Sequence, residues 1–200
     1  MNNNYTYIIA SIPALSPDSR FEGGSVMPLI GWIGSQLSDS DLKKLEFVCS
    51  GFKADKLDMD FYLKAFKSKD GFTREFFAHD LALRNAKVRY LNRELGRDKD
   101  KDVIELENAP EVDSAALDKI FGADNLLERE RAMDDYLWAT ADNITLFKDF
   151  ELAKVLAIVA KLCIIERWLA LDENTGRELL ATLVSGIRGT YGKIEFENYR

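Results

Sequence analysis

Apolar positions recur along most of the chain at helical rather than strand spacing, and the longest periodic run covers residues 71–95. Gly96 is placed to end a helix over this run. A neighbouring stripe on the same helix holds Phe76, Leu83 and Tyr90. The main seam follows alternating spacings of four and three residues, which puts its members on one face: Phe77, Leu81, Arg84, Val88, Leu91 and Leu95.

Further helices are predicted on both sides of this run. Ser38 or Ser40 can cap a helix that runs to Ser50, and a short helix is predicted over 58–67. Another helix is expected from about 124 to 142, and a last one is capped by Asp172. Residues 150–169 are apolar nearly all round, which is typical of a helix at the centre of a bundle.

The start of the chain has a different pattern. Residues 5–12 are β-branched and aromatic, which predicts a short strand or extended segment. Prolines and glycines between residues 13 and 28 indicate an irregular loop. For residues 193–200, a strand and an irregular tail both stay open. The fold class expected is therefore mainly α, a multi-helix bundle with a short N-terminal strand or extended segment.

Residues 97–113 have alternating charges and contain Pro110, which is typical of a surface linker. We expect this linker to divide the chain into an N-terminal segment and helical lobe over 1–96 and a C-terminal helical lobe over 114–200. One continuous domain is the alternative.

Composition narrows the classes of function. Apolar residues make up 46% and charged residues 30% of the chain, as in globular proteins, and the net charge is −7. Residues 105–135 hold ten acids and three bases, so the net charge of this acidic stretch, −7, is the same as that of the whole chain. An acidic protein is a poor general binder of nucleic acid or anionic lipid, so neither is expected as a partner.

Few residues indicate where the protein is located in the cell or whether it catalyses a reaction. The two cysteines, Cys49 and Cys163, fit a reducing compartment, and no signal peptide or membrane span is predicted, so we expect a cytoplasmic location. His79 is the single histidine, which excludes zinc sites built on two histidines. Neither a nucleophile elbow nor a phosphate loop is found. We expect no catalytic residue, cofactor or metal, although a carboxylate metal site stays open.

Charged and aromatic side chains at unusual positions are the candidate contact residues. Asp80 precedes Arg84 by four residues, which favours an ion pair on one helix face. This pair either stabilises the fold or holds two lobes or a partner together. Arg89, Arg93 and Arg97 form a basic ridge. This ridge is a solvated face, a docking face for an acidic partner, or a contact with the 105–135 stretch.

Three patches together resemble a bacterial family encoded among the genes of V-type ATPase subunits. The first covers residues 5–15, and the second is the Arg-Asn-Ala-Lys-Val-Arg run at 84–89 with Leu95 and Gly96. The third covers residues 128–138, followed by Phe150 and residues 161–168. The resemblance is carried by the order and spacing of the patches, and it extends over nearly the whole chain.

This resemblance implies a position and partners rather than a reaction. The corresponding protein would be the C (or d) subunit, a helical socket between the central shaft and the membrane ring. That subunit has three lobes, so 200 residues imply two lobes or a reduced version. Other V-type ATPase subunits would be the partners, at the cytoplasmic face of the membrane. An independent helical adaptor is the alternative. The partner-binding or lobe-packing candidates are Asp80, Arg84, Asn85, Arg89, Arg93, Trp138, Arg167 and Trp168.

Overall fold

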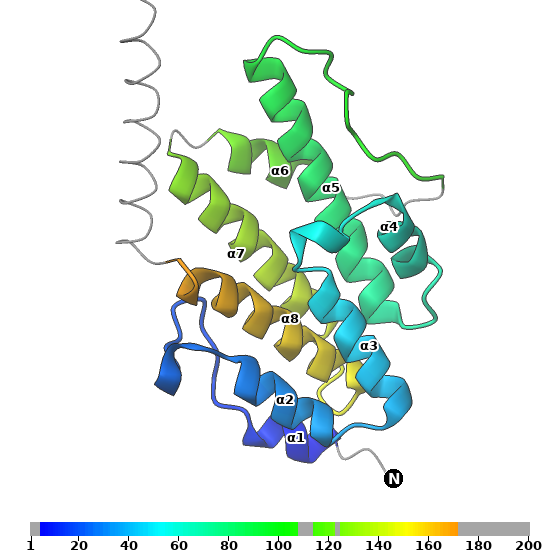
Figure 1. Ribbon diagram of the computed structural model, residues 1–200, viewed down its shortest axis with the longest axis vertical. Coiled ribbons are helices and arrows are strands. Elements are labelled where there is room, and N and C mark those ends of the chain that lie inside the picture. The colour runs from blue at the N-terminus through cyan, green and yellow to red at the C-terminus, as the bar shows by residue number, and fades with distance from the viewer. Residues whose placement is uncertain (1–4, 108–113, 123–124, 172–200) are drawn as a thin grey trace, which may run out of the picture. The chain divides into compact units, whose positions relative to one another are not determined.

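The computed structural model describes residues 5–107, 114–122 and 125–171, and this part of the chain is mainly helical without a strand (Figure 1). The prediction of a mainly α, multi-helix bundle is therefore confirmed. Two short 3-10 turns cover Glu22–Gly24 and Ala54–Lys56. The α-helices are α1 (Tyr5–Ser11), α2 (Met27–Ser35), α3 (Asp39–Ser50), α4 (Met59–Phe66), α5 (Gly71–Glu94), α6 (Ser114–Phe121), α7 (Leu126–Ile144) and α8 (Leu152–Leu169).

The chain divides into a compact unit that ends at Glu166 and a second unit that begins at Arg167. In the second unit the described residues are 167–171, the last turn of α8 and the residues after it. The helix predicted from Asp172 and the predicted tail lie outside the described residues. The predicted division at 97–113 stays a prediction.

Side-chain caps place the helix starts where the sequence predicts them. Ser38 accepts a hydrogen bond from the backbone of Asp41 at the start of α3, and Asp58 and Asp70 cap α4 and α5 in the same way. The glycines predicted to end helices are also found at helix ends. Gly51 follows the last residue of α3, and Gly96 turns the chain after α5 with a φ of +62°, where glycine is favoured.

The predicted N-terminal strand is wrong, because residues 5–11 form helix α1. β-branched residues only weakly prefer strands, and tertiary contacts decide between the two conformations. In the helix Ile8 is fully buried and the Tyr5 hydroxyl donates to Asp41 Oδ2 at 2.9 Å. Helix α2 was also missed, because Pro28 indicated a loop. Proline is accepted in the first helical turn, where no backbone donor is needed.

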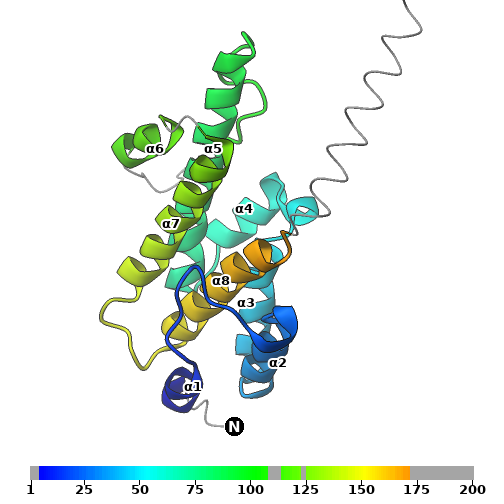
Figure 2. The same ribbon diagram turned by 90° about the vertical axis from the view of Figure 1, so that its left-hand side faces the viewer.

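Helix α8 lies at the centre of the first unit, as predicted from its apolar sequence. Both views place it between α7 and α2 (Figures 1 and 2). Its few charged groups have partners on the surrounding elements. Lys161 Nζ contacts Asp142 Oδ1 at 2.6 Å, and Glu166 accepts from Ser25 Oγ and from the backbone of Val26 before α2. Ten of its residues are buried: Ala153, Val155, Leu156, Ala157, Val159, Ala160, Leu162, Cys163, Ile164 and Ile165.

Aromatic rings from α3, α4 and α5 form a second part of the core. Phe61 stacks on Phe47, with 4.8 Å between ring centroids, and meets Phe77 edge-on at 4.9 Å. This cluster holds the first half of α5. The predicted seam of α5 is buried only there, because Leu91 and Leu95 are 44% and 60% exposed in the second half. The second half of α5 therefore has an apolar face that the described residues do not bury.

In the part of the chain that is described, no helix combines the length and the apolar character needed to cross a bilayer.

Candidate functional site

The second half of α5 borders a cavity of about 1280 Å³, which we call the α5 groove. Its walls are α5, α6 and the residues that follow α5. Pockets for small molecules typically measure about 300–1000 Å³, so the α5 groove is large enough for a segment of another protein. Four cationic side chains line it (Arg89, Arg93, Arg97 and Lys99), together with the rings of Tyr90 and Phe121 and the acidic Glu105.

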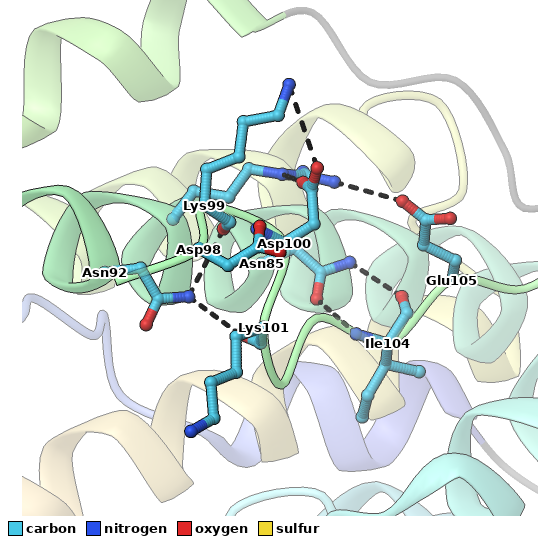
Figure 3. Close-up of polar contacts among 9 residues, drawn as sticks. Asn85, Asn92, Asp98, Lys99, Asp100, Lys101, Ile104 and Glu105 are labelled. Carbon is cyan, nitrogen blue, oxygen red and sulfur yellow. Dashed lines mark hydrogen bonds and ion pairs between the residues drawn. The ribbon is translucent and has the colours of Figure 1, made fainter. Parts of the chain in front are cut away.

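One wall of the α5 groove is made by residues 97–107, which we call the return segment, because hydrogen bonds attach it to α5 (Figure 3). The Asn85 amide donates to the carbonyl of Ile104 at 2.8 Å and accepts from the backbone N–H of Ile104 at 3.1 Å. The Asn92 amide donates to the carbonyls of Lys99, at 3.2 Å, and Lys101, at 2.7 Å. Two asparagine side chains, rather than a helix or strand, therefore hold the return segment against α5.

Asn85 belongs to the predicted site, whereas Asn92 was missed. The two residues are seven positions apart, which puts them on the same face of a helix. Asn92 is 4% exposed, although its apolar neighbours Leu91 and Leu95 are exposed. Two asparagines at this spacing before a glycine could have predicted the attachment of the return segment, because side-chain amides commonly form hydrogen bonds with backbone groups of turns.

The predicted basic ridge makes contacts within the chain. Arg89 pairs with Asp100 at 3.0 Å and with Glu105 at 3.4 Å, and Glu105 belongs to the acidic 105–135 stretch. The hydrogen bond from Arg89 lowers the pKa of Asp100. Arg93 lies 5.2 Å from the centroid of the Tyr90 ring and keeps 72% of its side chain exposed. One arginine of the ridge thus fastens the return segment, and the next one stays accessible from solvent.

The predicted Asp80–Arg84 pair is present, and it joins more helices than the sequence indicated. Asp80 Oδ2 accepts from the Arg84 Nε at 2.8 Å and from the Tyr62 hydroxyl of α4 at 2.6 Å. Burial raises the pKa of Tyr62, and the charge of Asp80 raises it further. Burial is the largest effect on Arg84 and lowers its pKa, but the charge and hydrogen bond of Asp80, with smaller effects of Tyr62 and Asp134, together outweigh it, so the net shift is upward. The pair therefore links α5 to α4.

The remaining candidates lie away from the α5 groove or outside the first unit. Trp138 of α7 has Lys161 Nζ 4.6 Å from its ring centroid, so it contacts α8. Arg167 and Trp168 stand in the last turn of α8, in the second unit, and their predicted role as contacts stays a prediction. The structure thus brings together Asn85, Arg89 and Arg93 at the α5 groove, with Arg84 directly before Asn85 and Asp80 a little more than one turn before it on α5.

His79, the single histidine of the chain, lies on α5. His79 Nδ1 lies 2.7 Å from the hydroxyl of Tyr136 and so connects α5 to α7, and burial lowers its pKa. Among the described residues, no group of three histidine, cysteine, aspartate or glutamate side chains could hold a metal ion. The charges and the volume of the α5 groove are suited to binding through charge and shape.

Replacing Asn92 with alanine is expected to release the return segment, because one side chain holds both the Lys99 and Lys101 carbonyls. The loss should be about 1–2 kcal/mol of unfolding free energy, with faster proteolytic cleavage between residues 97 and 107. Asn143→Ala, an exposed position on α7, is the matched control and should change neither quantity. Urea unfolding and limited trypsin digestion measure the two effects. Equal cleavage of Asn92→Ala and the unsubstituted chain would contradict the tether.

The fold and the site define a mainly helical protein with a partner-sized groove. The model of the family described as "Protein of unknown function (DUF2764)" matches residues 52–188, more than half of the chain, and the chain belongs to this family. The match includes α4, α5, α7 and the α5 groove. No curated protein and no solved structure matches the chain.

Proposed function

We propose that this protein is a non-catalytic subunit of a V-type ATPase, a central-stalk or coupling component between the catalytic head and the membrane ring. Two things support the proposal. The three sequence patches resemble a family encoded among V-type ATPase genes, and the α5 groove offers a protein-sized, cationic contact surface. The function would be mechanical, because a coupling subunit transmits force without making or breaking covalent bonds.

The observation that supports the proposal most is that the two halves of α5 have different surroundings. The first half is held by the aromatic cluster and by the contact of Asp80 with Tyr62, whereas the second half supplies most of the α5 residues that line the α5 groove. A straight helix of 24 residues is about 36 Å long, with 1.5 Å for each residue. A partner bound at the α5 groove would therefore exert force on a long helix whose first half is held in the core.

The charges of the α5 groove indicate the kind of surface that would dock there. Arg89 pairs with the return segment, whereas Arg93 pairs with its exposed neighbour Glu94 at 3.5 Å and stays 72% exposed. Arg97 and Lys99 also line the groove, and Lys99 contacts Asp100 at 3.7 Å. An acidic helix end or loop of another subunit is complementary to these groups. Contacts between exposed charges are screened by salt, so this docking should weaken as ionic strength rises.

An independent helical adaptor is the second candidate, and one observation favours it. The connection between α7 and α8 exposes Leu146, Phe147 and Phe150, of which Phe147 is 92% exposed. Exposed aromatic residues in a group are typical of protein contact sites of any kind. An adaptor would bind a stable partner that is not an ATPase subunit.

Purification of the tagged full chain from its native host tests the two functions. We expect the large V-type ATPase subunits to be recovered with the chain. Arg93→Glu together with Arg97→Glu should lower that recovery about tenfold or more, because like charges then face the partner. Lys64→Glu, at an exposed position of α4, is the matched charge control and should leave recovery unchanged. Recovery of a different partner would favour the adaptor, and recovery of no ATPase subunit would overturn the first proposal.

A further inference from the structure

Two cysteines that are 114 residues apart in sequence meet in the core. Cys49 of α3 and Cys163 of α8 have their sulfur atoms 3.8 Å apart, and both are free thiols. A disulfide needs about 2.05 Å between the sulfur atoms. Each sulfur is carried on a rotatable bond, so rotation of the side chains can shorten this distance.

The two thiols have unequal surroundings. Cys49 is partly exposed, whereas Cys163 is buried. The S–H of Cys163 donates to Cys49, and this bond lowers the pKa of Cys49, against the effect of burial and with help from the positive charge of Lys53. The same bond and burial raise the pKa of Cys163. Cys49 is therefore the thiol that ionises first and that a small solute can reach, which are the two properties of a reactive cysteine.

We propose that Cys49 and Cys163 form a reversible redox modification site, in which a peroxide oxidises Cys49 and Cys163 resolves the product to a disulfide between α3 and α8. The proposal is independent of the proposed ATPase role.

The chemistry balances with hydrogen peroxide as the oxidant. The Cys49 thiolate attacks one peroxide oxygen and the O–O bond breaks, which gives a sulfenic acid on Cys49 and hydroxide, and the hydroxide takes a proton to become water. Cys163 sulfur then attacks Cys49 sulfur, the S–O bond breaks, and the hydroxyl leaves with the Cys163 proton as a second water. Two thiols lose two electrons, and one peroxide is reduced to two waters. A dithiol reductant reverses the change by thiol–disulfide exchange.

The expected consequence is a more stable fold, because the bond would close a loop of more than one hundred residues. Cross-links that close long loops restrict the unfolded chain most. The bond would fix α8, the central helix, to α3, which carries Phe47 of the aromatic cluster. For a chain of this length we expect the melting temperature to rise by roughly 5–10 °C.

The full chain treated with hydrogen peroxide tests the proposal. Both thiols should disappear together, the intact mass should fall by two hydrogen atoms, and a digest should contain a linked peptide pair with Cys49 and Cys163. Dithiothreitol should restore two thiols and the original melting temperature. Persistence of two free thiols at a peroxide excess, or a sulfinic acid on Cys49 in place of the disulfide, would overturn the proposal. Intermolecular dimers linked through Cys49 would overturn it as well.

Single serine variants separate the roles of the two cysteines. Cys163→Ser should accumulate a sulfenic acid on Cys49 that dimedone labels, since the resolving thiol is gone. Cys49→Ser should react with peroxide at least tenfold more slowly, because Cys163 is buried and its ionisation is suppressed. Equal peroxide reactivity of the two variants would contradict the assignment of Cys49 as the attacking thiol.

Discussion

Replacing Gly51 with alanine is expected to lower the unfolding free energy by about 3 kcal/mol, at the upper end of the usual cost of overpacking a core. A Cβ atom at this position would lie 2.2 Å from Cε1 and 2.4 Å from Cζ of Phe77, well inside contact distance. The φ of Gly51 is −68°, which alanine adopts without strain, so the clash alone causes the loss. Phe77 is fully buried against Phe61 and Phe47 and has little room to move. Urea unfolding measures the change.

Two further variants make this result specific. Gly31 of α2 has no atom within 4 Å of an added Cβ, so Gly31→Ala should be neutral or stabilise by about 0.5–1 kcal/mol. Adding Phe77→Leu to Gly51→Ala should recover part of the loss, because the smaller side chain makes room, so the two changes will not be additive. A Gly51→Ala chain as stable as the unsubstituted one would show that the ring can move aside.

Replacing Asp80 with alanine is the second change with a large expected effect, about 3 kcal/mol of unfolding free energy. The carboxylate of Asp80 is 4% exposed and serves two partners, and its loss leaves the buried Tyr62 hydroxyl without its acceptor and Arg84 without its closest counter-ion. Asp60→Ala, an exposed carboxylate on α4, is the matched control and should stay within about 0.5 kcal/mol. Thermal and urea unfolding measure both variants.

Arg84→Ala distinguishes a structural role from a partner role at the same cluster. Because 41% of the Arg84 side chain is exposed, solvent screens its charge, and the loss should be smaller than for Asp80→Ala, about 1–2 kcal/mol. A lower melting temperature with normal partner recovery would establish a structural role. Unchanged stability with loss of complex assembly would instead assign Arg84 to the partner surface.

The helical elements were largely predictable, because their signals are local. Ser38, Asp58 and Asp70 supply caps that the chain carries next to the helices they start, and Gly51 and Gly96 follow the helix ends. Helix α1 was not predictable in this way. Its β-branched residues favour a strand locally, and the burial of Ile8 and the bond from Tyr5 to Asp41 depend on the folded core.

The candidate site was predictable only in part, for a related reason. The arginines of α5 stood out by their spacing, whereas Asn85 entered only through the family resemblance. The contact of Arg89 with Glu105 agrees with one of the alternatives for the basic ridge. The shape of the α5 groove depends on where residues 97–107 run, and α6 was not predicted as a helix. The Cys49–Cys163 pair had no sequence signal at all, because nothing local relates two isolated residues of α3 and α8.

The return segment and the thiol pair also differ in when they can form during folding. The contacts of Asn92 span seven and nine residues and those of Asn85 span nineteen, so the return segment can dock once α5 has formed. The contact between Cys49 and Cys163 spans 114 residues and requires α3 and α8 to have assembled. Contacts of long sequence separation are the slow ones in folding. The rate at which the buried Cys163 thiol becomes protected from alkylation during refolding would therefore report when α3 and α8 assemble.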